Sequence, residues 1–234
     1  MATGTDRIER YGRRARWLHA VVYLTTLLLL ATGLWLLVGR EGQPSILARV
    51  TGVGDTRLHI WLGWVLTGVA MLGLVAGVRA IPTFLRETVR RDPGDLRWFL
   101  RWPRGAFTGR FARHEGEWDP GQRIANMVIV IGLLALIVTG VGLAMLHGGH
   151  LFAWLAKVHK WTAIVMTPVL LGHILIAAGV LPGYRGVWRS MHLGGRLRDE
   201  TAQRLWPAWT EERTPVPTHA SHEKDLVDRT SPER

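Results

Sequence analysis

Hydrophobic and polar positions divide the chain into four long apolar stretches separated by polar, mostly basic segments. The apolar stretches cover residues 17–38, 58–78, 124–146 and 158–181, and Lys160 is the only charged side chain among them. Each reaches the length of about 20 residues that a membrane-spanning helix needs. Their side chains are apolar on all sides, whereas the helices of a soluble bundle would show polar stripes. The pattern predicts an all-α fold, an integral membrane four-helix bundle.

The polar segments give the expected organisation around this bundle. Residues 1–16 form a basic arm, residues 17–182 the four-span domain and residues 183–234 a polar tail. From about residue 214 the tail is rich in Pro, Thr and charged residues, so we expect it to be disordered. No internal repeat is evident.

The longest connection, residues 79–123, mixes aromatic with basic side chains. This mixture is typical of a segment lying on the membrane surface, and a plain basic loop is the alternative. Tryptophans of the tail are expected to rest at the same interface. The aromatic residues concerned are Trp98, Phe99, Trp102, Phe107, Trp188, Trp206 and Trp209.

Basic residues are distributed unevenly between the two sides of the bundle. The arm, the 79–123 connection and the tail together hold 24 Lys and Arg, against 5 on the side of the connections 40–57 and 147–157. Because positive charge stays inside, we expect a bacterial cytoplasmic-membrane protein with both termini in the cytoplasm. This asymmetry accounts for the net charge of +11, so the partner expected is anionic membrane lipid and not nucleic acid.

The first span follows a basic arm, as the apolar run of a signal peptide does. Its apolar run is too long for a signal peptide, and no small-residue cleavage site follows it, so we expect it to be retained. Cysteine is absent, which excludes thiolate-ligated iron–sulfur clusters and a haem covalently attached through a Cys-x-x-Cys-His motif. Any haem held by this chain must therefore be non-covalent and b-type.

Four histidines, His19, His59, His159 and His173, lie in the predicted spans, where ionisable residues are costly and mark functional sites. Fourteen residues separate His159 from His173, a rise of about 21 Å and roughly 40° short of four turns. Both imidazoles therefore project from the same side of the helix, at two different depths in the membrane. Depth pairs His59 with His159 on the outer side and His19 with His173 on the inner side. Two axial imidazoles suit a haem for electron transfer, so we predict two haem b.

Two glycines support this arrangement. Counting fourteen residues on from His19 gives Gly33, and from His59 gives Gly73. Each lies on the histidine face of its helix at the depth of the other haem. A missing side chain there would let a porphyrin approach the backbone closely.

Other readings of the histidines stay open. Membrane histidines also hydrogen-bond between helices. His147 and His150, in the second short connection, compete with His159 as outer ligand, and a kink at Pro168 would alter how His159 and His173 face. The remaining histidines are expected in solvent; they are His114, His192, His219 and His222.

With these features the chain resembles the membrane cytochrome b (gamma) subunit of respiratory formate dehydrogenases and its relatives in hydrogenases, over residues 11–210. The four-histidine pattern carries most of the resemblance. The stretches concerned are Arg13-Arg14-Ala15-Arg16-Trp17-Leu18-His19, Arg57-Leu58-His59, Gly121-Gln122, Val138-Thr139-Gly140-Val141, Lys157-Val158-His159 with His173, and Trp206-Pro207-Ala208-Trp209.

The resemblance implies the same histidine pairing, and a quinone site beside His173 and the loop that enters the third span. In that loop the residues implied to bind quinone are Asp119, Gly121 and Gln122. The family tends to have Asn-Ala-Gly-Gln, so Asp119 and Pro120 depart from it. Asp119 is either a proton relay to quinone or an ordinary charge at a helix N-terminus.

The function implied is that of an electron-transfer subunit in a quinone-reducing respiratory oxidoreductase. Electrons would arrive outside from the iron–sulfur subunit of a formate dehydrogenase- or hydrogenase-like complex, which also contains the catalytic subunit. They would pass through two bis-histidine haems to menaquinone or ubiquinone on the cytoplasmic side. The alternatives are a stand-alone di-haem cytochrome b that reduces quinone and a haem-free membrane anchor or transporter. The absence of Asp and Glu from every span argues against cation-coupled transport.

Overall fold

Four long helices form the body of the molecule in a computed structural model that describes residues 7–39 and 43–213. They are α1 (Arg13–Val38), α3 (Asp55–Gly77), α6 (Pro120–Met145) and α7 (Gly149–Ala177). All four are long and apolar enough to cross a membrane, which confirms the number of predicted spans. The expected disorder after residue 214 lies outside the described residues.

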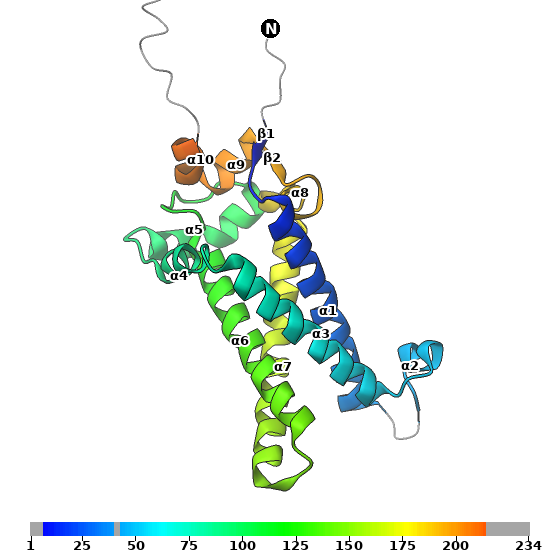
Figure 1. Ribbon diagram of the computed structural model, residues 1–234. Coiled ribbons are helices and arrows are strands. Elements are labelled where there is room, and N and C mark those ends of the chain that lie inside the picture. Colours follow the sequence, from blue (N-terminus) through cyan, green and yellow to red (C-terminus); the bar gives the residue numbers. More distant parts are fainter. Residues whose placement is uncertain (1–6, 40–42, 214–234) are drawn as a thin grey trace, which may run out of the picture.

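The helices pack as two antiparallel pairs, α1 with α3 and α6 with α7, and α3 joins the pairs by packing on α6 (Figure 1). A short helix, α2 (Ile46–Thr51), stands beside the bundle at the end where α1 passes into α3. Leucine, valine and isoleucine side chains are exposed along every span. Such exposure is expected where the helices face lipid.

The fourth span differs from its predicted bounds. We expected a connection over residues 147–157, but α7 begins at Gly149, so only Leu146–Gly148 separate it from α6. The polar residues before the predicted span belong to the same helix, because the first turns of a long helix can project beyond the apolar core. Helix α7 runs through Pro168 without interruption.

A polar cap covers one end of the bundle, where both described chain ends lie (Figure 1). Its elements are β1 (Arg7–Glu9), α4 (Ile81–Val89), α5 (Asp95–Thr108), η1 (Pro182–Tyr184), α8 (Arg189–His192), β2 (Arg196–Arg198), α9 (Asp199–Leu205) and α10 (Pro207–Arg213). Strands β1 and β2 pair antiparallel, with Arg7 opposite Arg198. The plain basic loop considered for residues 79–123 is therefore wrong, because that segment contains α4 and α5.

The cap has its own hydrophobic core. It contains Leu197, Ala202 and Leu205 together with Trp206 and Trp209, which are only 4% and 2% exposed. We predicted an interfacial position for these two tryptophans, and that was wrong. The guanidinium of Arg10 lies 4.6 Å and 4.2 Å from the centres of their rings, close enough for cation–π attraction.

Arg123 ties the cap to the bundle. It lies in the first turn of α6 and is 2% exposed. Its guanidinium donates to the Asp92 carboxylate at 2.9 Å and to the Trp118 carbonyl at 3.0 Å, with Asp95 3.4 Å away. A buried guanidinium needs such a set of acceptors to offset its lost hydration. These contacts hold the connection from α4 to α6 in place.

Candidate haem sites

His59 and His159 form a pair at the end of the bundle remote from the cap, which we call the loop-end site. His59 lies in the first turns of α3, and His159 lies ten residues into α7. Their ring centres are 6.2 Å apart and their ring planes are inclined by 85°. The rings therefore face each other from helices of different pairs, as depth predicted.

Each of these imidazoles has a threonine partner on the neighbouring helix. The Nδ1 atom of His59 lies 2.9 Å from Oγ1 of Thr32 on α1, and Nδ1 of His159 lies 2.9 Å from Oγ1 of Thr139 on α6. Both threonines are buried. The two halves of the site thus repeat the same contact.

A glycine follows each threonine and makes room for the ring. A Cβ on Gly33 would lie 3.2 Å from Cε1 of His59, and one on Gly140 would lie 3.3 Å from Cε1 of His159. Gly33 is therefore at the predicted depth, but the group lying against its backbone is an imidazole. Gly73 lies at the other depth, where its Cβ would be 3.2 Å from the side chain of Leu18.

His19 and His173 share a cavity at the cap end of the bundle, which we call the cap-end site. The cavity measures about 500 Å³, within the range of about 300–1,000 Å³ that is usual for ligand and cofactor sites. It opens between α1, α6, α7 and the cap. Its lining residues are His19, Val22, Tyr23, Thr26, Leu27, Ile129, Leu133, Leu170, His173, Ile174, Ala177, Ala178, Trp188 and His192.

His192 is a third histidine at the cap-end site. Its ring centre lies 6.2 Å from that of His19 and 5.5 Å from that of Tyr23. We expected His192 in solvent, and its side chain is exposed, yet it lines the cavity. It comes from the short helix α8, whereas His173 belongs to a span.

The two sites fit a haem held by two histidines on different grounds. A ring nitrogen lies about 1.1 Å from its ring centre and a metal–imidazole bond is about 2.0 Å, so two rings on one metal have centres about 6.2 Å apart. The loop-end pair has this separation. At the cap end His19 and His192 also have this separation, so spacing does not single out His173 there. The fit of a haem at that end rests on the apolar cavity and on Nδ1 of His19, a buried nitrogen without a hydrogen-bond partner among the described residues.

The three residues implied to bind quinone have structural contacts of their own. Asp119 is buried and caps α6 by accepting from the Gln122 backbone N–H at 2.8 Å. A Cβ on Gly121 would lie 2.9 Å from the Trp98 ring, and the Gln122 side-chain oxygen accepts from Trp206 at 3.3 Å. Burial raises the pKa of Asp119, although hydrogen bonds from Gln122 and Gly121 and the charge on Arg123 act against it. None of the three lines the cap-end cavity.

Three further histidines in the described part of the chain lie away from the two sites. His114 is 3% exposed and its Nε2 lies 2.8 Å from the Leu205 carbonyl oxygen, so the solvated position that we predicted is wrong. His147 and His150 are exposed at the turn between α6 and α7. His219 and His222 lie outside the described residues.

Sequence analysis missed Thr32, Thr139 and the role of Gly140. The dipeptide Thr-Gly occurs in the first span at Thr32-Gly33 and in the third at Thr139-Gly140, on the two helices that pack against those carrying His59 and His159. It also occurs in the second span at Thr67-Gly68, where the threonine bonds only within its own helix. The dipeptide alone therefore does not identify the residues that contact the histidines.

The spans and histidine sites together define a membrane cytochrome b that holds two b-type haems. The chain matches the family described as "Prokaryotic cytochrome b561" over residues 10–194. It belongs to that family and is a di-haem, b561-type membrane electron carrier. A search of curated proteins finds no match to this chain.

Proposed function

We propose that this protein carries electrons across the membrane from the loop-end site to the cap-end site and delivers them to quinone. In this proposal His59 and His159 hold one haem, and His19 and His173 hold the other. The observation that carries the proposal is the separation of 6.2 Å between the ring centres of His59 and His159, which would suit two histidines that hold one haem.

The residues supply binding and orientation, while bound haem iron supplies one-electron redox chemistry. A haem held by two imidazoles would have no free position on its iron, which would favour electron transfer over oxygen binding. His159 and His173, fourteen residues apart on α7, set the two sites about 21 Å apart along the helix. The apolar side chains of the spans keep charge and water away from the path.

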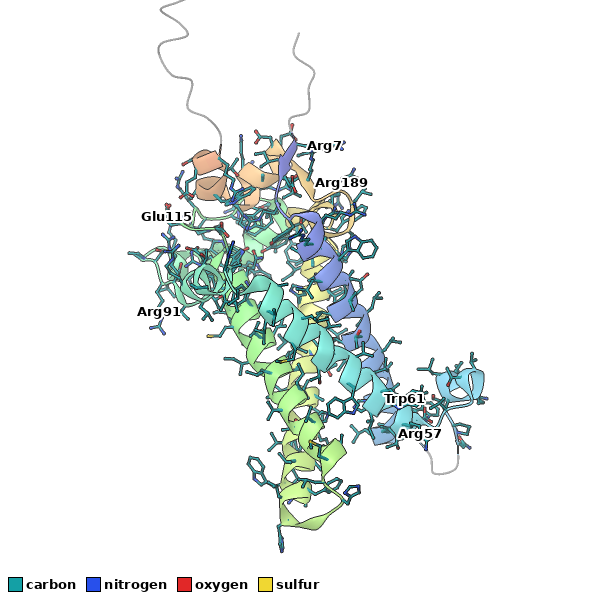
Figure 2. The ribbon with its side chains drawn as sticks, in the orientation of Figure 1. Arg7, Arg57, Trp61, Arg91, Glu115 and Arg189 are labelled. Atoms are coloured by element: carbon teal, nitrogen blue, oxygen red, sulfur yellow. The ribbon has the colours of Figure 1, made fainter. Side chains whose placement is uncertain are left out.

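The cap end is assigned to the cytoplasm because it carries most of the basic residues. Figure 2 shows Arg7, Arg91 and Arg189 around the cap, with Arg57 at the opposite end. Quinone would therefore be reduced near the cap, taking two electrons from the cap-end site and two protons from the cytoplasm. Asp119, Gly121 and Gln122 remain our candidates for positioning quinone.

The electron donor is proposed to be the iron–sulfur subunit of a formate dehydrogenase- or hydrogenase-like complex. This chain has no cysteine with which to hold a cluster, so a partner must supply one. Copurification of iron–sulfur and molybdenum or nickel subunits would support this assignment. A fully active, solitary chain would favour a stand-alone quinone reductase.

Haem quantitation of purified variants tests the ligand assignment. Wild-type protein should contain about two haem b per chain, and H59A, H159A, H19A and H173A should each contain about one. H147A and H150A are the matched controls and should keep two. Two haems retained in H59A and H159A would reject the loop-end assignment.

A further inference from the structure

We propose that Thr32 and Thr139 are positioning residues that fix the ring tautomers of His59 and His159 and lower the reduction potential of the loop-end haem. This inference rests on the proposed ligand role of the two histidines. It assigns a function to two buried hydroxyls that do not themselves touch the iron.

Each threonine hydroxyl also has a backbone carbonyl of its own helix within hydrogen-bonding distance. The Thr32 hydroxyl lies 2.8 Å from the Leu28 carbonyl, and the Thr139 hydroxyl lies 2.6 Å from the Ala135 carbonyl, both one turn back. A hydroxyl has one hydrogen, and a carbonyl can only accept. Ligation through Nε2, as proposed, puts the proton on Nδ1; the hydroxyl hydrogen then goes to the carbonyl, and each contact of 2.9 Å is a bond donated by Nδ1–H to Oγ1. The ring of His159 also lies within hydrogen-bonding reach of the Leu136 carbonyl.

This direction of donation has a consequence for the metal. A neutral imidazole with its proton on Nδ1 has its free lone pair on Nε2. Each threonine thus selects the tautomer in which Nε2 is the ligating atom. The hydrogen bond also makes the imidazole a more basic ligand. A more basic ligand stabilises ferric over ferrous iron, which lowers the reduction potential.

The two sites differ in this respect. Both loop-end imidazoles have a hydroxyl acceptor, whereas Nδ1 of His19 at the cap end is buried without a partner in the described part of the chain. This difference favours the lower potential at the loop-end haem. Electrons entering there would then move toward the cap-end site in the favourable direction.

The test is a redox titration of the purified, haem-loaded protein carrying T32V or T139V. Valine keeps the shape of the side chain and removes the acceptor. Although the two threonines lie on different helices, both variants should move the same one of the two haem components to a higher potential. The other component should stay in place, and T32V/T139V should move the first further.

Thr67 and Thr167 provide matched controls. Each donates its hydroxyl to a carbonyl one turn back at 2.8 Å, on α3 and α7, eight residues beyond His59 and His159. T67V and T167V should leave both potentials unchanged. T32S and T139S keep the hydroxyl and should restore the wild-type potential, including where the valine variant binds its haem weakly.

Low-spin ferric EPR spectra give a second readout, since the g anisotropy depends on the angle between the two ring planes, 85° here. The valine variants should change one of the two low-spin signals. Unchanged potentials and signals in T32V and T139V, with two haems present, would overturn this inference and leave the ligand assignment standing. If H59A and H159A keep both haems, the proposed function itself fails.

Discussion

Gly33 lies against the imidazole of His59, so close that a Cβ on Gly33 would come within 3.2 Å of the ring's Cε1 atom. Gly140 stands in the same relation to His159, at 3.3 Å. Real Cβ atoms rarely make contacts this short, and each histidine ring is also held by a threonine hydroxyl on the same helix as its glycine. The backbones of α1 and α6 therefore restrict how far the two imidazole rings can move toward these helices.

Replacing Gly33 by valine should displace His59 and weaken the loop-end site. Two methyl groups beyond Cβ have no room beside the ring, so the ring must rotate or move toward His159. We expect G33V to lose about one haem per chain, measured by pyridine haemochrome. G68V is the matched control, because a Cβ on Gly68, in the middle of α3, meets nothing within 4 Å. Full haem content in G33V would contradict this steric role of Gly33.

Alanine variants can show whether His173 or His192 pairs with His19 as a haem ligand. Both line the cap-end cavity with His19, but His173 projects from a span and His192 from a four-residue helix in the cap. We expect H173A to lose one haem and H192A to keep two, since a span holds a ligand more rigidly than a short surface helix. The opposite result would make His192 the partner of His19.

Acid should loosen the connection between cap and bundle. Burial alone would raise the pKa of Asp92, but hydrogen bonds from Arg90 and Arg123 outweigh it and hold the pKa below its ordinary value of 3.8. A carboxyl with a lowered folded-state pKa adds stability above the unfolded-state value, and this stability is lost as pH falls through the folded-state value. The loss should therefore appear below about pH 4.

Protease resistance of the cap against pH measures this effect. Wild-type protein should become sensitive as the pH falls below that value. D92N should be more sensitive than wild type at pH 7, and the difference should vanish in acid. D199N, at the start of α9, is the control, since Asp199 has no part in the contacts of Arg123. Equal sensitivity of wild type and D92N at pH 7 would count against the role of Asp92.

Single cysteines can establish the orientation, because the chain has none of its own. Arg91→Cys places a thiol on the cap and Arg57→Cys places one at the opposite end, at two positions labelled in Figure 2. In intact cells a membrane-impermeant maleimide should label R57C and should reach R91C only after the membrane is opened. Labelling of R91C in intact cells would reverse the assigned direction of electron flow.

The sequence predicted the features that depend on the bilayer. Four apolar runs and the depth of each histidine follow from helix geometry and membrane thickness, and the structure brings His59 to His159 accordingly. The cap was not predictable in this way. In the cap, Trp206 and Trp209 contact Arg10, which is nearly two hundred residues away in the sequence. A local sequence pattern does not predict contacts between segments so far apart.

Among the site residues, the candidate haem ligands were easier to predict than the residues that position them. A histidine in a span is conspicuous because burying an ionisable side chain in the membrane is energetically unfavourable. Threonine is common in spans, and its hydroxyl can hydrogen-bond to a carbonyl of its own helix. Only the tertiary contact to Nδ1 distinguishes Thr32 and Thr139 from Thr67 and Thr167. His192 was missed for a related reason, since it comes to the cavity from a segment that reads as polar.

The cavity at the cap end separates α1 from α6 and α7, so the bundle is incomplete there without an occupant. A cofactor that fills such a space adds its binding free energy to the stability of the folded chain. A haem bound in this cavity would therefore contribute to the stability of the fold as well as to electron transfer.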